Sequence, residues 1–307
     1  MTENVKYSLI IPVLHIDGNP YLESILESLS KQSFTPESVH LVIGDRRQGR
    51  AINYGVSQAE TKYIGTVDDD SQIDDPKLFR KLIDAMESDK SIGIGGAACT
   101  IPDFATPFQK RAMRQIPRRF FPVQSKNIDS DMVQHPCLIM DRRFFLEIGG
   151  EDEELIRGLD PVLRKKVRDA GKRVVIIADT WIYHLIPDGF LKVIKMYYRN
   201  GRGSGYASRN FPERVIELSD GFDNGEFIER RSFVFRVFRR LFSLIVSMCK
   251  FEFIKIATDI AYMSGVLKEK ITPSYINIPK VNKIETKIDK NNKYPFKLFL
   301  HHVELEK

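Results

Sequence analysis

Apolar and polar positions alternate between two periods along the first half of the chain. Tyr7–Val13 is a continuous apolar run with the length of a buried strand, and Tyr21–Ser30 then repeats apolar residues at helical spacing. The alternation continues with a strand at Val39–Ile43, a helix near Ala51–Ala59 and a strand at Lys62–Val67. Strands that alternate with helices predict an α/β fold with a mainly parallel sheet covered on both faces.

The next elements are predicted from capping residues and short apolar runs. Asp75 and Pro76 are typical of an N-cap and a first helical position, which predicts a helix to about Met86. Further on, the pattern predicts a strand, two helices and another strand at Cys137–Met140, Arg142–Ile148, Pro161–Ala170 and Val174–Ala178.

The last third of the chain has a different pattern. Ser232–Lys250 is a strongly apolar helix with one polar stripe, and Phe251–Leu267 is a second helix. The lysine-rich tail from Lys268 is expected to be irregular up to Tyr294–His301. We therefore expect an α/β domain over residues 1–212 and a helical extension with a tail over residues 213–307. The stripe consists of Arg236, Arg240, Ser243, Ser247 and Lys250.

Composition limits the partners and the location. A formal charge of +6 and a pI near 9.0 favour anionic partners such as nucleotides, phosphates or acidic lipid. Neither a signal peptide nor a spanning segment is evident, which predicts a cytoplasmic protein. Basic Gln109–Lys126 and the Ser232–Lys250 helix would bind an anionic membrane surface; alternatively, that helix packs on the domain with its polar stripe outward. Three separated cysteines predict reduced thiols: Cys99, Cys137 and Cys249.

Three consecutive acids carry the sharpest chemical signal. Asp68, Asp69 and Asp70 directly follow the strand that ends at Val67, and parallel sheets bind ligands at the carboxyl ends of their strands. Alternation would point Asp70 at a divalent cation while Asp68 holds a ribose or a metal-bound water. Such a cation would bridge two phosphates of a nucleotide. An acidic turn is the alternative interpretation.

Two later residues extend this site. Asp160 precedes Pro161, so it is either a helix N-cap or a general base that accepts a proton from a hydroxyl, and both roles are compatible. His184 follows the strand Val174–Ala178, where a neutral imidazole would complete the metal site or fill a structural place.

Four segments in order resemble glycosyltransferase family 2, the inverting nucleotide-sugar enzymes with the GT-A fold. The resemblance extends from Tyr7 to Pro187. The segments are LIIPV, GRAINYGVSQAETKYIGTVDDDS, CLIMDRRFFLEIGGEDEEL and GLDPVLRKKVRDAGKRVVIIADTWIYH.

The resemblance implies a GT-A fold with a C-terminal helical extension and a metal-dependent inverting transfer. A sugar would pass from a nucleotide diphosphate donor to a hydroxyl of a glycan or lipid-linked acceptor, as in polysaccharide synthesis. Asp160 is then the base, and Asp70 and His184 hold Mn²⁺ or Mg²⁺. The residues expected at the nucleotide sugar are Pro12, Val13, Asp45, Arg50, Asn53, Asp68, Asp69, Arg199 and Arg202.

Departures from the family pattern leave alternatives open. Leu159 replaces the usual acid before the base, which favours a non-catalytic nucleotide-sugar-binding or membrane-binding relative. Arg199–Arg209 is rich in glycine and arginine, so we expect either a mobile loop that closes over the diphosphate or a solvated linker. His15–Gly18 lacks a triphosphate-binding loop and disfavours a sugar nucleotidyltransferase. Nucleic acid is not an expected partner.

Overall fold

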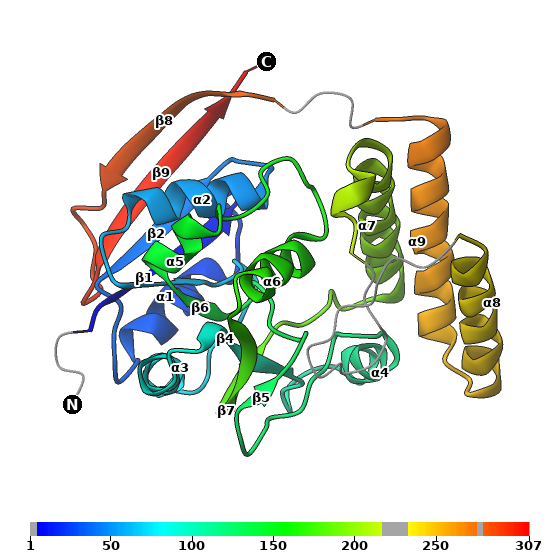
Figure 1. Ribbon diagram of the computed structural model, residues 1–307, viewed down its shortest axis with the longest axis horizontal. Coiled ribbons are helices and arrows are strands. Elements are labelled where there is room, and N and C mark those ends of the chain that lie inside the picture. The colour runs from blue at the N-terminus through cyan, green and yellow to red at the C-terminus, as the bar shows by residue number, and fades with distance from the viewer. Residues whose placement is uncertain (1–4, 217–232, 275–278, 307) are drawn as a thin grey trace.

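The computed structural model describes residues 5–216, 233–274 and 279–306 of the chain. Its centre is a mixed sheet of nine strands in the order β5-β7-β4-β6-β3-β1-β2-β9-β8 (Figure 1). The strands are β1 (Tyr7–Val13), β2 (Ser38–Ile43), β3 (Tyr63–Thr66), β4 (Ile92–Thr100), β5 (Ile128–Asp129), β6 (Leu138–Asp141), β7 (Arg173–Tyr183), β8 (Val281–Ile288) and β9 (Lys297–Leu305).

Helices cover both faces of this sheet and also form a separate group beside it (Figure 1). They are α1 (Leu22–Ser30), α2 (Gln48–Gln58), α3 (Leu78–Ser88), α4 (Pro107–Gln115), α5 (Arg142–Glu147), α6 (Leu159–Asp169), α7 (Phe190–Asn210), α8 (Phe233–Cys249) and α9 (Phe253–Ile271). A 3-10 turn, Pro212–Arg214, follows α7. This mixed α/β arrangement confirms the predicted fold class.

Alternate side chains of β1 pack into two hydrophobic cores. Leu9 and Ile11 belong to a core with α1 and α3, whereas Ile10 belongs to a second core with α2, α5 and α6. Strand β1 is completely enclosed, because it pairs in parallel with both β2 and β3. Its buried, continuously apolar sequence is the consequence of having helices on both faces.

The end of the chain completes the sheet instead of forming an irregular tail. β9 pairs in parallel with β2, and β8 pairs antiparallel with β9. The expectation of an irregular segment up to Tyr294 was therefore wrong, since Val281–Ile288 is a strand. A lysine-rich sequence is typical of solvated, irregular chain. Here the lysines lie on the outer hairpin of β8 and β9, which pairing with β2 holds in place. The division at residue 212 stays a prediction.

Buried polar side chains fasten this hairpin across four strands. Thr61 donates to Ser8 (2.8 Å), and Ser8 and Ser38 share a hydrogen bond (2.8 Å). Ser38 then contacts His40 (2.9 Å), and His40 Nδ1 lies 3.0 Å from His301 Nε2. Thr286 of β8 closes the series with a 2.9 Å hydrogen bond to His301.

Glycines of α7 and α9 allow the backbones of these two helices to come unusually close. A Cβ on Gly201 would lie 2.0 Å from the carbonyl oxygen of Tyr262 on α9, and one on Gly265 would lie 2.1 Å from that of Tyr198. Glu269, fully buried on α9, receives Arg202 and Arg209 from α7. The predicted mobile loop at Arg199–Arg209 was wrong: these glycines serve close helix packing within one continuous helix.

Candidate active site

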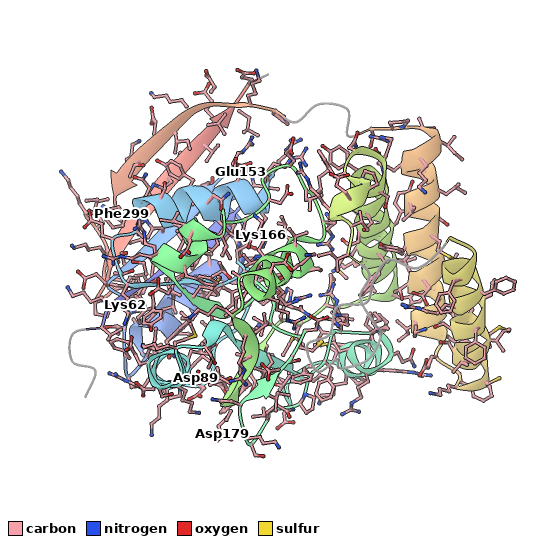
Figure 2. The ribbon with its side chains drawn as sticks, viewed as in Figure 1. Lys62, Asp89, Glu153, Lys166, Asp179 and Phe299 are labelled. Atoms are coloured by element: carbon pink, nitrogen blue, oxygen red, sulfur yellow. The ribbon has the colours of Figure 1, made fainter. Side chains whose placement is uncertain are left out.

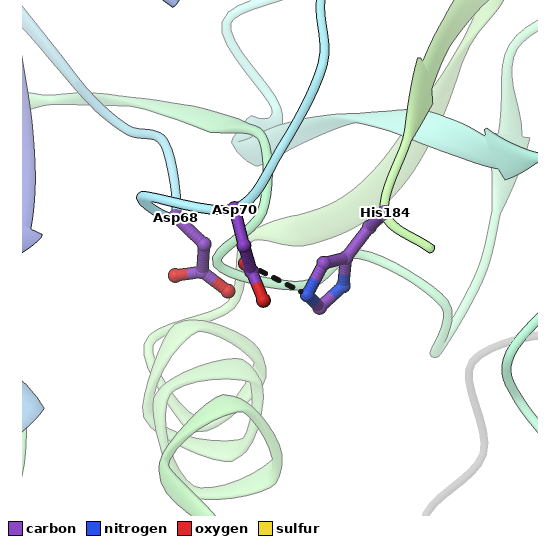
Figure 3. Close-up of side chains that lie close together, drawn as sticks. All are labelled: Asp68, Asp70 and His184. Atoms are coloured by element: carbon purple, nitrogen blue, oxygen red, sulfur yellow. Dashed lines mark ion pairs between the residues drawn. The ribbon is translucent and has the colours of Figure 1, made fainter. Parts of the chain in front are cut away.

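The acidic run lies in a tight turn at the carboxyl end of β3. The N–H of Ser71 donates to the carbonyl of Asp68 (3.0 Å), which closes the turn. Gln72 then pairs antiparallel with Tyr183, the last residue of β7. Because His184 directly follows Tyr183, this bridge brings the acidic turn against it. Asp70 Oδ1 lies 3.1 Å from His184 Nε2 (Figure 3).

Asp68, Asp70 and His184 together form a candidate metal centre. One ligand atom from each lies within 4.8 Å of the other two, and the Asp70 carboxylate points toward the imidazole (Figure 3). Two carboxylates and an imidazole are donors that Mn²⁺ accepts, and the carboxylates also suit Mg²⁺. The structure thus brings together Asp70 and His184, the two predicted metal ligands, with Asp68, which was predicted to hold a ribose or a metal-bound water.

The carboxylates of the acidic turn disfavour one another's charge. Burial and the neighbouring charge of Asp70 raise the pKa of Asp68 to about 6. Burial and Asp70 likewise raise the pKa of Asp69 to about 6. Carboxylates that repel one another in this way gain from a cation, so the residues fit a divalent metal.

Asp70 and His184 form an ion pair, which favours the protonated imidazole. Burial alone would raise the pKa of Asp70, but the hydrogen bond and charge of His184, with the charge of Arg119, lower it. Burial opposes the charged form of His184, and Asp70 outweighs it and raises the His184 pKa. A metal requires the neutral imidazole as a ligand, so binding would release this proton.

Asp68 and Asp69 have further partners that set their directions. Gln48, on the first turn of α2, donates to Asp68 Oδ1 at 2.8 Å. Asn19 donates to Asp69 Oδ2 at 2.9 Å. The side chain of Asp69 is therefore held by the loop after β1, and it is absent from the candidate metal group found among the described residues.

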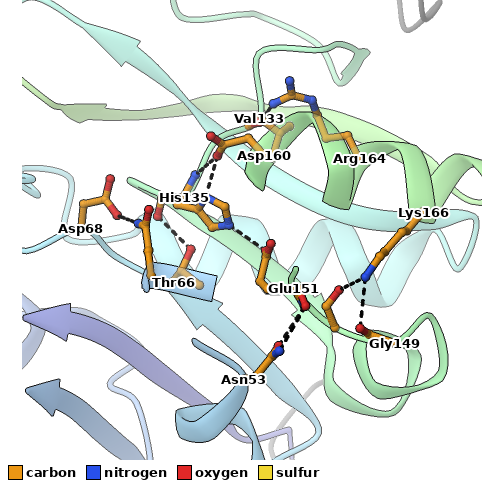
Figure 4. Close-up of polar contacts among 12 residues, drawn as sticks. Asn53, Thr66, Asp68, Val133, His135, Gly149, Glu151, Asp160, Arg164 and Lys166 are labelled. Carbon is orange, nitrogen blue, oxygen red and sulfur yellow. Dashed lines mark hydrogen bonds and ion pairs between the residues drawn. The ribbon is translucent and has the colours of Figure 1, made fainter. Parts of the chain in front are cut away.

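Asp160 contacts a buried histidine that the sequence analysis did not single out. His135 is 2% exposed, and its Nδ1 lies 2.7 Å from Asp160 Oδ1 (Figure 4). The backbone N–H of His135 donates to the same oxygen at 2.8 Å. On its other side, His135 Nε2 lies 2.7 Å from Glu151 Oε1. His135 is thus enclosed between two carboxylates.

This arrangement makes His135 a buried cation and keeps Asp160 ionised. Burial disfavours the charged imidazole, but the charges of Asp160 and Glu151 raise the pKa of His135 well above its usual value. Burial would raise the pKa of Asp160, and the charge and hydrogen bonds of His135 lower it strongly instead. An ionised, fixed carboxylate is what a general base requires.

Asp160 is not the N-cap that its sequence context suggests. The N-cap of α6 is Gly158 in a left-handed conformation (φ 88°), and Asp160 lies in the first turn. The carboxylate is directed to His135 rather than to its own helix. Similarly, α3 begins at Leu78 rather than after Asp75, because Asp75 accepts from the N–H of Lys77 in the preceding turn.

Leu159 belongs to the hydrophobic core, where it is 3% exposed and packs with Leu155 and Ala207. An acid at this position would be buried among apolar side chains. The second carboxylate near the candidate base comes instead from Glu151, through His135. Glu151 follows the pair Gly149-Gly150, both of which adopt positive φ.

Several residues expected at the nucleotide sugar are paired with each other. Arg50 donates to both oxygens of Asp45, with Nε to Oδ2 at 2.6 Å and Nη2 to Oδ1 at 2.8 Å. Asn53 accepts from the N–H of Glu151 (2.8 Å), so it holds the chain beside His135. Pro12 and Val13 end β1 as predicted.

Two further arginines lie within electrostatic reach of the carboxylates. Arg119 lowers the pKa of Asp70 through its charge, and its Nε donates to Tyr197 at 3.1 Å. Arg157 is exposed and interacts electrostatically with both Asp160 and Arg119. The predicted residues Arg199 and Arg202 lie on α7, where Arg202 pairs with Glu269. The basic composition of Gln109–Lys126 was the only sequence signal for Arg119.

Comparison with known structures identifies the fold. A mannosyltransferase from Pyrobaculum calidifontis, in complex with GDP-Man and Mn²⁺, matches over 88% of each chain with a TM-score of 0.56 and 11% identity. The likeness at this identity is one of fold, the GT-A glycosyltransferase fold. Weaker matches include S. aureus TarS 1–349 with UDP-GlcNAc, over 67% of each chain with a TM-score of 0.45 and 16% identity.

Residues 8–149, a little under half of the chain, match the model of glycosyl transferase family 2. This part of the chain is similar to the glycosyltransferases of that family, in agreement with the sequence resemblance. The matched range includes the acidic turn and His135 but ends before Asp160 and His184, so the structure adds these two residues to the site. No curated protein matches the sequence of the chain.

Proposed function

We propose that the chain is a metal-dependent, inverting glycosyltransferase that transfers a sugar from a nucleoside diphosphate sugar to an acceptor hydroxyl. The observation that carries this proposal is the grouping of Asp68, Asp70 and His184 within 4.8 Å at the ends of β3 and β7. Asp160 interacts electrostatically with Asp68, so a base and a cation site face the same region.

In this mechanism Asp70 and His184 would hold Mn²⁺ or Mg²⁺, with Asp68 toward the cation or the ribose. The cation would supply charge for the departing diphosphate. Arg119 and Arg157 add positive charge near the same carboxylates. Pro12, Val13, Asp45 and Asn53 remain proposed contacts of the nucleotide.

Asp160 would take the proton of the acceptor hydroxyl as its oxygen bonds to the anomeric carbon. The bond from that carbon to the diphosphate oxygen breaks on the opposite side, so the configuration inverts. His135 keeps Asp160 ionised and fixes one of its oxygens, which leaves the other oxygen for the proton.

The acceptor class is a glycan or a lipid-linked glycan, which agrees with a location at the inner face of a membrane. GDP-Man and UDP-GlcNAc in the structural neighbours support a nucleotide-sugar donor for this chain. The alternative is a nucleotide-sugar-binding protein without transfer activity, for which Leu159 in place of an acid is the supporting observation.

The test is release of the nucleoside diphosphate from a panel of nucleotide sugars, with Mn²⁺, Mg²⁺ or chelator. We expect release from one donor, and its loss with chelator and in Asp70→Ala. Metal-dependent nucleotide binding by calorimetry without release, even with glycan acceptors present, would favour the binding protein. Absence of both binding and release would overturn the proposal.

A further inference from the structure

Helix α8 presents its apolar side to solvent. Along 17 residues it repeats large apolar side chains that are 41% to 68% exposed. The α8 apolar face consists of Phe235, Phe238, Leu241, Phe242, Ile245 and Met248. This spacing of three and four residues aligns them on one side of a helix. A surface of this kind on a folded protein marks an interaction site.

Two serines of α8, Ser243 and Ser247, are turned inward toward α9, whereas the polar residues of a solvated helix face outward. Lys255 of α9 is 8% exposed and donates to Ser243 (2.8 Å) and Ser247 (3.0 Å) of α8. The sequence alternative, in which the polar stripe faces outward, is therefore wrong for these two serines. The hydrogen bonds between their hydroxyls and the ammonium group of Lys255 form only in this orientation of α8. These buried hydrogen bonds therefore fix the apolar side of α8 toward the outside.

Among the described residues, α8 lies at the outer edge of the molecule beside α9, and its drawn side chains project away from α9 (Figure 2). Phe251, in the turn between the two helices, and Phe253, the first residue of α9, are 67% and 60% exposed and continue the apolar surface. No helix among the described residues is long and apolar enough to cross a membrane.

Charge identifies the occupant. Residues 233–250 contain no acid, and the structure describes the side chains of two cations in this segment, Arg239 and the exposed Lys250. Helix α4 also lacks acids, carries exposed Arg111 and Arg114, and joins the base of α9 through the hydrogen bond from Ile254 N–H to Gln115 (3.1 Å). A second copy docked on this face would oppose cation to cation, whereas an anionic lipid surface complements both the apolar and the basic residues.

We propose that the α8 apolar face inserts into the interfacial region of a bilayer that contains anionic lipid, with α8 parallel to the membrane plane and α4 against the headgroups. This docking is independent of the transfer reaction. If the proposed function holds, it places the site at the membrane surface, where a lipid-linked acceptor would be presented.

The test is flotation of the full chain with phosphatidylcholine vesicles, with and without phosphatidylglycerol, at low and high salt. Neither donor nor metal is needed, so this result is separate from the test of activity. We expect association with the anionic vesicles that weakens with salt. Phe238→Asp/Phe242→Asp should reduce it at least tenfold, and Arg111→Gln/Arg114→Gln should reduce the preference for anionic lipid.

The matched control is Leu146→Asp, which changes a side chain that is 47% exposed on α5, away from α8. It should float like the unchanged protein. Circular dichroism and nucleotide binding should be the same for all variants, because these side chains are at the surface. Lack of association, or equal association of the double aspartate variant, would overturn the proposal. A dimer that this variant dissociates, without any vesicle binding, would assign the face to a second copy.

Discussion

Two buried histidine groups in this molecule have opposite electrostatic character. His135 lies between the carboxylates of Asp160 and Glu151, which raise its pKa well above the usual value. His40 and His301 lie between hydroxyls, and burial lowers their pKa values to about 3 and about 4. The same side chain is a fixed cation at the site and a neutral hydrogen-bonding group in the sheet. Partners, rather than burial alone, decide the charge.

The largest effect on activity is expected from removing the carboxylate of Asp160, which His135 holds in place. Asp160→Asn should lower turnover by a factor of hundreds or more and leave nucleotide binding nearly intact, because the amide cannot accept the proton. Steady-state kinetics and calorimetry measure the two quantities. Unchanged turnover would remove Asp160 from the mechanism.

Replacing the protonated His135 should destabilise the protein and shift the pH dependence of turnover. His135→Gln leaves two carboxylates without their buried partner, which we expect to cost about 3 kcal/mol in the free energy of unfolding. The pKa of Asp160 should rise, so the acid limb of the rate profile should move to higher pH. Urea unfolding and the pH dependence of turnover check this.

Glu151→Gln serves as the control for that change, since it keeps a hydrogen-bonding side chain beside His135 and leaves Asp160 in place. It should lower the pKa of His135 and shift the acid limb less than His135→Gln does. A rate profile that does not move in either variant would show that His135 is structural only.

Because His40 and His301 are neutral in the folded state, we expect the C-terminal hairpin to lose stability at acid pH. The pKa values of His40 and His301 are lower in the folded state, so the unfolded state binds more protons below pH 6.5. Stability from these groups is present above that pH and is lost toward pH 4, by roughly 1.4 kcal/mol per pH unit for each histidine. Over the same range His135 stays charged and loses nothing; its contribution falls only at alkaline pH, as the pH rises through its raised pKa.

Hydrogen exchange of the β9 amides at pH 7 and pH 5 measures this effect. Exchange should accelerate at pH 5 after correction for the intrinsic rate. His301→Gln should cost about 1 kcal/mol at neutral pH, the typical value of a lost hydrogen bond, and should reduce the acid sensitivity. Equal protection at both pH values would contradict the neutral state of the pair.

Local patterns predicted the parts of the fold that depend on neighbouring residues. The strand β1 and the acidic turn after β3 could be predicted, because a buried strand is continuously apolar and a ligand-binding strand end carries polar residues. Gly201 and the neighbouring glycines of Arg199–Arg209 were misleading, since the helix they belong to depends on close packing between α7 and α9, which local propensity does not contain. Tertiary contact overrode the local signal there.

The residues of the candidate site likewise divide into those that the sequence indicated and those that it did not. Asp68, Asp70 and His184 carried recognisable motifs, and the structure brings them together. His135 had no such signal, because it lies in an irregular segment and its role depends on Glu151 and Asp160, which are distant in sequence. The pairing of Arg50 with Asp45 was likewise invisible, although both residues were named.

The pairing of β9 with β2 has a consequence for how the molecule is made. His40 and His301 are 261 residues apart in the chain, so the edge of β2 stays uncovered while the ribosome translates the intervening residues. A nascent or prematurely terminated product would expose an apolar strand edge, which is a template for aggregation. Biosynthesis of this enzyme should therefore depend on chaperones that shield β2 until the final strand emerges.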